Sequence, residues 1–112
     1  MVKPEKFFQD RIIKILTKRG YLVLNCASKQ IFDLVAIKQQ TAYPFEVKAR
    51  KTYYGEKQKQ EQAKIIDHCQ SVFFVIKQSS RRGKMHLSQG GGERQAGILL
   101  KRLQIDLGDY LI

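Results

Sequence analysis

The stretch FDLVAIKQQTAYPFEVKA, residues 32–49, decides the fold. Its two ends, 32–38 and 43–49, are rich in apolar β-forming residues, and the polar tripeptide QQT lies between them. Two such runs around a short polar connection predict a pair of antiparallel strands joined by a turn.

Two acidic residues, Asp33 and Glu46, each interrupt one of these apolar strands. Side chains alternate between the two faces of a strand, so Glu46 and Lys48 share a face. A turn centred on the Gln40–Thr41 bond would place Asp33 opposite Lys48. Glu46 would then be the diagonal neighbour of Asp33, about 7–8 Å away at Cα. The strand pair therefore brings two carboxylates and a lysine together.

This combination of side chains suits the hydrolysis of a phosphodiester. Two carboxylates can hold Mg²⁺ through oxygen ligands at about 2.0–2.1 Å, and we expect Mn²⁺ to substitute for it. Such a metal polarises the phosphate and lowers the pKa of a bound water, while a lysine stabilises the negative charge of the transition state. We therefore predict Asp33 and Glu46 as metal ligands and Lys48 as a catalytic residue. An ordinary surface ion pair between Glu46 and Lys48 is the alternative.

The flanking sequence predicts the rest of an α/β fold. Residues 4–19 show a helical pattern that ends before Gly20. Its apolar stripe consists of Phe8, Ile12, Ile15 and Leu16. Further strands are expected at 21–27 and 71–77. A helix is expected at 55–70, between the third strand and the fourth. The order α-β-β-β-α-β, with a helical crossover before the last strand, predicts a mixed β-sheet flanked by helices.

Residues 79–112 carry weaker patterns. They predict a short strand at 84–87 and a last helix at 96–103, and the glycines 90–92 are interpreted as a flexible connector. We expect the 112 residues to form one domain, with a core in about 4–78 followed by a basic loop and a C-terminal tail.

Composition narrows the partners and the compartment. Lys and Arg number 21 against 10 Asp and Glu, a net charge of +11 that favours binding to phosphate backbones. The longest apolar run, 72–76, is far shorter than the roughly 20 residues of a membrane span, and the N-terminus has no signal-peptide pattern. Cys26 and Cys69 form no CxxC pair. We therefore expect a cytoplasmic protein with free thiols, DNA as its partner and no membrane association.

The ordered motifs resemble those of the PD-(D/E)XK nuclease superfamily. The tripeptide IFD that ends at Asp33 and the segment PFEVK at 44–48 match its signature, and the closest similarity is to the archaeal-type Holliday junction resolvases. The strings GYLVL, DLVAIK, EVKARK and EQAKII extend the resemblance over about residues 7–77. This resemblance implies a restriction-endonuclease-like core, Mg²⁺-dependent cleavage of four-way DNA junctions and a homodimer.

The resemblance also implies roles for single residues. Asp33 and Glu46 would bind the metal, Lys48 would be the catalytic lysine, and Ser28 would lie near the scissile phosphate. Gln62 matches the glutamine of a helix motif in the family.

One position departs from the family pattern. The family usually has a glutamate in the first helix, eleven residues before the glycine that corresponds to Gly20, and this chain has Gln9 there. Glu5 lies one turn earlier on the same helical face and is one candidate to replace it. Gln9, acting through a water molecule, is the other. Both are kept as candidate catalytic residues, and a weakened site is the alternative.

Gln62 is also prominent without the resemblance. Ile65, Ile66 and Cys69 follow it at the spacing of one helical face, so its amide is predicted to point toward the sheet. A buried amide needs a hydrogen-bond partner. An exposed glutamine near the start of the helix is the alternative.

Basic and aromatic residues near the predicted site are candidate DNA contacts. The cations would bind the phosphate backbone and the tyrosines would stack on an opened base, while a solvated loop is the alternative. These candidates are Lys29, Arg50, Lys51, Tyr53, Tyr54, Arg81 and Arg82. The apolar tail, residues 98–112, is the expected dimer surface.

Two other functions remain open. One is a repair or restriction-type nuclease of the same superfamily, because a fold does not fix its substrate. The other is a DNA-binding module without catalysis, which Gln9 in place of a glutamate suggests.

Overall fold

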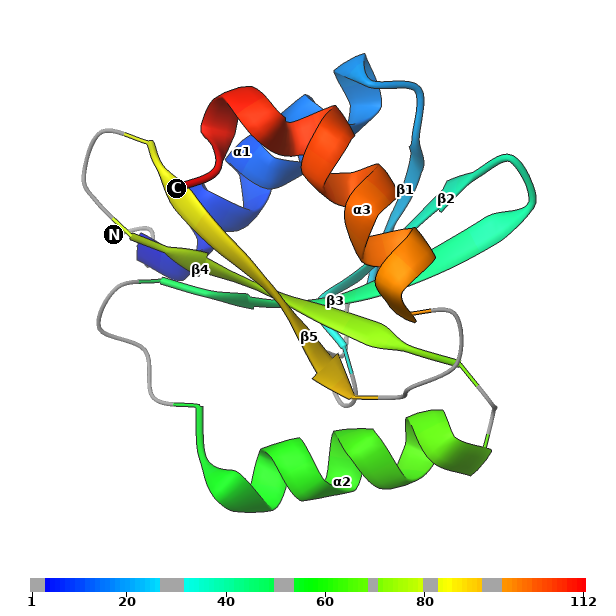
Figure 1. Ribbon diagram of the computed structural model, residues 1–112. Helices are drawn as coiled ribbons and strands as arrows, with labels where there is room; N and C mark the ends of the chain where they lie inside the picture. Colours follow the sequence, from blue (N-terminus) through cyan, green and yellow to red (C-terminus); the bar gives the residue numbers. More distant parts are fainter. Residues whose placement is uncertain (1–3, 27–31, 50–53, 69–70, 80–82, 92–95) are drawn as a thin grey trace.

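A five-stranded β-sheet forms the middle layer of the fold, with helices on both of its faces (Figure 1). The computed structural model describes residues 4–26, 32–49, 54–68, 71–79, 83–91 and 96–112. Along the chain the elements are α1 (Pro4–Lys18), β1 (Leu22–Asn25), β2 (Leu34–Lys38), β3 (Thr41–Lys48), α2 (Glu56–His68), β4 (Phe73–Gln78), β5 (Met85–Gly91), α3 (Ala96–Leu107) and the 3-10 helix η1 (Gly108–Tyr110). Within these residues no helix is both long and apolar enough to cross a membrane.

The strands follow one another across the sheet in chain order, β1-β2-β3-β4-β5. β3 and β4 pair in parallel, and every other neighbouring pair is antiparallel. The predicted mixed sheet flanked by helices is therefore confirmed, with α2 as the crossover between the two parallel strands. β4 has neighbours on both sides, which explains its unbroken run of buried residues at 73–76.

The turn of the hairpin lies one residue earlier than predicted. Lys38 pairs with Thr41, so the turn is centred on the Gln39–Gln40 bond. Both glutamines have a positive φ, 52° and 64°. A two-residue turn with positive φ at both positions matches the twist of the strands that it joins.

This turn corrects the predicted pairing by two residues. Leu34 pairs with Phe45, so continuing the register by one residue places Asp33 beside Glu46 rather than opposite Lys48. A shift of two residues keeps every side chain on its face of the sheet. The shared face of the two acids and the lysine is therefore as predicted, although the pairing was wrong.

The larger hydrophobic core lies between the sheet and the pair α1 and α3. The predicted apolar stripe of α1 is buried along its whole length. α3 extends to Leu107, beyond the predicted end at 103, because Leu99, Leu103 and Leu107 all pack into this core together with Met85 and Leu87. The core therefore continues well past residue 78, where we expected it to end.

α2 covers the opposite face of the sheet (Figure 1). Ile66 packs there against Phe32, Phe73 and Val75. Ile65, predicted in the same stripe, remains 36% exposed. This second core is small, and it leaves room on the same face for polar side chains.

Two of the three glycines at 90–92 belong to a strand and not to a flexible connector. β5 runs to Gly91, well past the predicted end at residue 87. A Cβ atom on Gly90 would overlap the Phe73 ring, and one on Gly91 would lie 2.6 Å from it. These glycines are needed because the buried ring packs against the backbone of β5. Gly92 lies outside the described residues.

Candidate active site

Three charged side chains are buried on the face of the sheet that α2 covers. Asp33, Glu46 and Lys48 expose only 6%, 3% and 6% of their surface. Charged residues are rarely buried to this degree unless they are paired. The structure therefore places all three predicted residues on one face of the sheet.

The backbone of β3 holds Asp33 in place. The Oδ2 atom of Asp33 accepts a hydrogen bond of 2.7 Å from the Val47 N–H. The Asp33 N–H donates to the Phe45 carbonyl oxygen at 3.0 Å. The backbone of the neighbouring strand therefore orients this carboxylate.

Glu46 is the centre of the polar contacts on this face. Its Oε1 atom lies 3.2 Å from the Lys48 ammonium and accepts a hydrogen bond of 3.2 Å from Gln58. Its Oε2 atom accepts a hydrogen bond of 2.8 Å from the Gln62 amide. Gln62 itself is buried, as predicted. Both oxygens of the carboxylate are thus fixed by named donors.

These donors do not fully offset the burial of Glu46. Burial, together with the negative charge of Asp33, raises the pKa of Glu46 from 4.5 to about 7, against the lowering effect of Gln62 and Lys48. The two acids therefore repel each other when both are ionised. A raised pKa at a cluster of this kind is typical of functional sites.

Gln58 of α2 and Tyr54, just before α2, complete the arrangement. Gln58 was not among the predicted site residues, although it lies four residues before Gln62 on the same helical face. The Tyr54 hydroxyl donates a hydrogen bond to Gln62 Oε1. We refer to the set of Asp33, Glu46, Lys48, Tyr54, Gln58 and Gln62 as the Glu46 cluster.

Gln9 is buried on the other side of the sheet, where α1 packs. Its Nε2 atom donates a hydrogen bond of 2.9 Å to Oδ1 of Asn25, at the end of β1. Its Oε1 atom is buried and has no hydrogen-bond partner among the described residues. The residue after Asn25, Cys26, is close to Asp33, since its N–H donates to the Asp33 carbonyl oxygen. Gln9 thus lies near the strand ends that carry Asp33, but its amide bonds to Asn25.

Several predicted site residues cannot be placed. They lie outside the described residues, or, for Glu5, only the helical backbone is described. They are Glu5, Ser28, Lys29, Arg50, Lys51, Tyr53, Arg81 and Arg82. Of the predicted DNA contacts, Tyr54 alone is described.

The Glu46 cluster fits a divalent cation by its chemistry. Among the described residues no group of three or more His, Cys, Asp or Glu side chains could hold a metal. Asp33 and Glu46 still offer two carboxylates, which are hard oxygen ligands of the kind that Mg²⁺ and Mn²⁺ prefer. A cation between them would relieve the repulsion that raises the pKa of Glu46.

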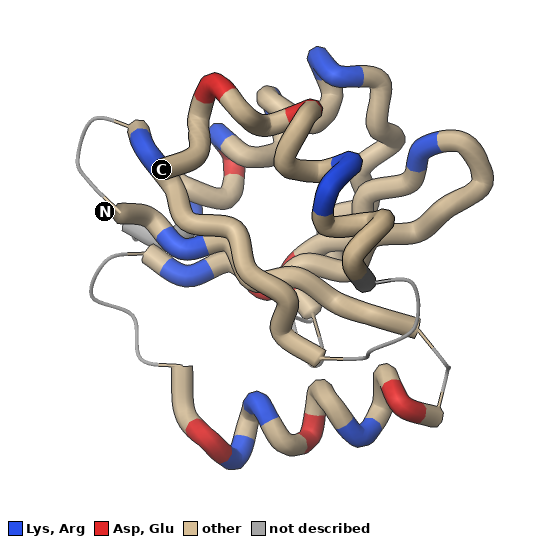
Figure 2. The backbone as a smooth tube through the Cα atoms, in the orientation of Figure 1, with Lys and Arg blue, Asp and Glu red and all other residues tan. Residues whose placement is uncertain are grey.

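Charge is distributed unevenly around this site. Acidic and basic residues are interspersed along α2 in equal numbers (Figure 2), so the helix that covers the site contributes no net charge. The ends of β3 and β4 are basic instead, because the exposed Lys77 pairs with Lys48 across the two strands. His86 of β5 is the next neighbour of Lys77. Lys77 and His86 therefore lie in line with Lys48 of the Glu46 cluster, at one end of the sheet.

Comparison with known proteins bears on the fold of this chain. No protein-family model and no curated protein matches this sequence. A solved structure does: Hjc, a Holliday junction resolvase from the archaeal hyperthermophile Archaeoglobus fulgidus, with a TM-score of 0.66. The match covers 79% of this chain and 74% of Hjc, at 19% sequence identity. The two proteins share a fold, which agrees with the fold class predicted from the sequence.

Proposed function

We propose that this protein is a metal-dependent DNA endonuclease of the PD-(D/E)XK type and that it cleaves four-way DNA junctions. The observation that carries the proposal is the buried set of Asp33, Glu46 and Lys48 on the face of the sheet under α2. The fold that the chain shares with a Holliday junction resolvase supports the choice of substrate.

Asp33 and Glu46 would hold Mg²⁺, or Mn²⁺ in its place. The bound cation would supply Lewis acidity toward the phosphate and an activated water. The chain's own residues do the positioning. The Val47 N–H holds Asp33, while Gln58 and Gln62 hold the two oxygens of Glu46. The Lys48 ammonium, which is buried beside Glu46, is placed to stabilise negative charge on a phosphate oxygen.

The distribution of charge supports DNA as the substrate. The net charge of +11 attracts a polyanion. Lys77 and His86 would guide the phosphate backbone past the end of β3, where Lys48 lies.

Symmetric cleavage of a four-way junction needs two active sites, so we propose a homodimer. The expected dimer surface in the C-terminal tail is partly used by the core, because Leu103 and Leu107 are buried in it. Ile98, Ile105 and Ile112 remain 59%, 72% and 79% exposed and are available to a second copy of the chain.

The test is cleavage of matched four-way, flapped and linear DNA with Mg²⁺, beside Glu46→Ala and an EDTA control. Glu56→Ala is the matched control variant, since Glu56 is an exposed acid on α2. Symmetric nicks in the four-way junction alone, lost with Glu46→Ala and with EDTA, are the expected result. Equal cutting of flaps or ends would leave a nuclease of the repair or restriction type.

The small number of carboxylates in the site supports a second candidate function. Gln9 is neutral, and only two carboxylates lie in the Glu46 cluster as described. A DNA-binding module without catalysis would bind the junction in EDTA as tightly as in Mg²⁺ and would cut none of the three substrates with any divalent metal.

A further inference from the structure

Tyr54 occupies a central place beside the candidate catalytic residues. It is half-buried and lies just before α2. Its hydroxyl donates to Oε1 of Gln62. The centre of its ring lies 5.2 Å from the Lys48 ammonium and 5.2 Å from the Lys59 ammonium. One side chain thus contacts both the amide that binds Glu46 and the lysine beside Glu46.

The hydroxyl of Tyr54 stabilises the orientation in which the NH₂ end of the Gln62 amide faces Glu46. A glutamine amide has a donor end and an acceptor end. The Tyr54 hydroxyl donates to the acceptor end, so the donor end is left to bind Glu46 Oε2 at 2.8 Å. Hydrogen bonds in a chain also polarise one another, so donation by Tyr54 strengthens donation by Gln62.

The ring of Tyr54 acts on the lysine. An ammonium group near an aromatic face is held there by the charge distribution of the ring. The Lys48 ammonium lies over this ring and is also 3.2 Å from Glu46 Oε1. The ring therefore limits the positions that the ammonium can take.

We infer that Tyr54 is a positioning residue of this site, which orients Glu46 through Gln62 with its hydroxyl and holds Lys48 with its ring. The inference rests on the proposed nuclease function. It replaces the role expected from the sequence, in which Tyr54 stacks on a DNA base. A stacking residue would act on DNA binding, whereas a positioning residue acts on the chemical step.

The two parts of Tyr54 can be tested separately. Tyr54→Phe removes the hydroxyl and keeps the ring, and Tyr54→Leu removes both. We expect Tyr54→Phe to lower kcat for junction cleavage about tenfold with little change in KM, and Tyr54→Leu to lower it about threefold more. Tyr110→Phe is the matched control, because the ring of Tyr110 also lies under a cation, the Arg11 guanidinium, away from the site. It should cleave as the wild type does.

A double-mutant cycle separates positioning from DNA contact. In a Gln62→Ala background, Tyr54→Phe should have no further effect on kcat, because the amide that it orients is gone. An increase in KM alone, of equal size with and without Gln62, would overturn the inference and make Tyr54 a DNA contact. Unchanged kinetics in Tyr54→Phe, in an enzyme that cuts, would also overturn it and leave the nuclease function intact.

A measurement without DNA covers the case in which the chain cuts nothing. The side-chain amide signals of Gln62 in a ¹⁵N NMR spectrum report its hydrogen bonds. We expect these signals to shift and to exchange faster in Tyr54→Phe, with the Tyr110→Phe spectrum as reference and circular dichroism to show that both variants fold. Unchanged Gln62 signals would overturn the inference. Shifted signals in a protein without nuclease activity would support the orienting role and reject only the proposed function.

Discussion

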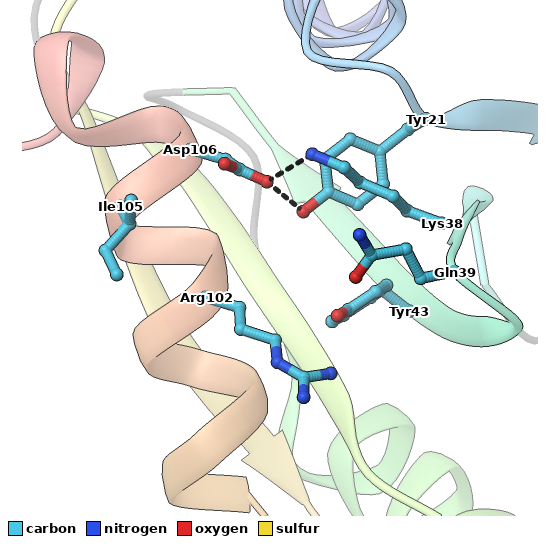
Figure 3. Close-up of a pocket in the computed structure, with 7 residues that line it drawn as sticks. All are labelled: Tyr21, Lys38, Gln39, Tyr43, Arg102, Ile105 and Asp106. Atoms are coloured by element: carbon cyan, nitrogen blue, oxygen red, sulfur yellow. Dashed lines mark hydrogen bonds and ion pairs between the residues drawn. The ribbon is translucent and has the colours of Figure 1, made fainter.

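The protein has a polar cluster on each side of its sheet, and the two are built from the same kinds of side chain. Under α2, Glu46 lies with Lys48 and Tyr54. Under α3, the Oδ2 atom of Asp106 accepts hydrogen bonds from the Tyr21 hydroxyl at 2.7 Å and the Lys38 ammonium at 3.1 Å (Figure 3). We call Asp106, Lys38 and Tyr21 the Asp106 cluster.

The two acids differ in how well their charge is balanced. The side chain of Asp106 is 25% exposed, against 4% for Glu46. Burial alone would raise the pKa of Asp106, but hydrogen bonds from Tyr21 and Lys38 outweigh it and the pKa is lowered. The pKa of Glu46 is raised, because burial and the charge of Asp33 outweigh its donors.

This difference separates a structural cluster from a candidate functional one. The Asp106 cluster fastens α3 to the hairpin through the Lys38–Asp106 contact, and Lys38 also donates to the carbonyl oxygen of Arg19, just after α1, at 2.8 Å. Its charges are matched within the fold. In the Glu46 cluster the donors do not offset the burial of Glu46 and the charge of Asp33. A bound cation would balance this negative charge.

The largest expected difference between the clusters is catalytic. Lys48→Ala should lower the rate of junction cleavage about 10²–10³-fold, because it removes the charge that stabilises the transition state. Lys38→Ala should leave the rate unchanged and lower the free energy of unfolding by about 1 kcal/mol. Single-turnover cleavage and urea denaturation measure the two effects. Equal effects of both substitutions on the cleavage rate would remove the distinction.

The clusters should also respond to pH in opposite directions. Glu46 keeps its proton in the folded state up to about pH 7 and loses it near 4.5 when unfolded. Without metal, its contribution to stability is therefore present below pH 4.5 and lost as the pH rises to 7, a loss of about 3 kcal/mol. Asp106 behaves oppositely: its contribution is present above pH 3.8 and is lost as the pH falls through its lowered pKa.

Urea denaturation in EDTA between pH 3 and 8 measures these contributions. Glu46→Gln should flatten the neutral part of the stability profile, and Asp106→Asn the acid part. A Glu46→Gln profile parallel to that of the wild type would show that the charge of Glu46 is already balanced in the fold.

Gln9→Glu tests whether position 9 reaches the candidate metal site. Without metal the variant buries a carboxylate beside Asn25 Oδ1, which we expect to lower the free energy of unfolding by about 2 kcal/mol. Mg²⁺ should restore the melting temperature of this variant and raise it less in the wild type. Gln104→Glu, at an exposed position of α3, is the control. No recovery with Mg²⁺ would make Gln9 a structural partner of Asn25.

The smallest expected effect concerns the basic end of the sheet. Lys77→Ala should weaken junction binding about threefold in EDTA. It should also reduce the slope of the logarithm of the binding constant against the logarithm of salt concentration by about one. Lys101→Ala, on the exposed side of α3, should have a smaller effect. Fluorescence anisotropy at several salt concentrations measures both. Equal salt slopes for the two variants would mean that DNA does not follow the ends of β3 and β4.

Much of the fold could be predicted because it depends on local patterns. Alternation along the two strands placed Glu46 and Lys48 on one face, and helical spacing placed Gln62 under the sheet. The register could not be predicted, because Gln39 and Gln40 form a turn that usually contains Asn or Gly. The role of the glycines at 90 and 91 depends on Phe73, which is far away in the sequence.

The candidate site was predicted less completely than the fold. Asp33, Glu46 and Lys48 were found because charges inside apolar strands are conspicuous in a sequence. Gln58 and the hydroxyl contact of Tyr54 were missed, because uncharged side chains at the start of a helix resemble an ordinary solvated surface. Long-range packing brings them to Glu46, and no pattern within α2 requires it.

The most direct test of the account is the rate at which Asp33→Asn nicks a four-way junction in Mg²⁺, compared with the wild type and Asp106→Asn. Asparagine can still accept the Val47 hydrogen bond, so this substitution removes the charge and keeps the local structure. We predict that Asp33→Asn loses activity at least about a hundredfold while Asp106→Asn cuts as the wild type does. Cutting by Asp33→Asn at the wild-type rate would contradict the assignment of the active site to the Glu46 cluster.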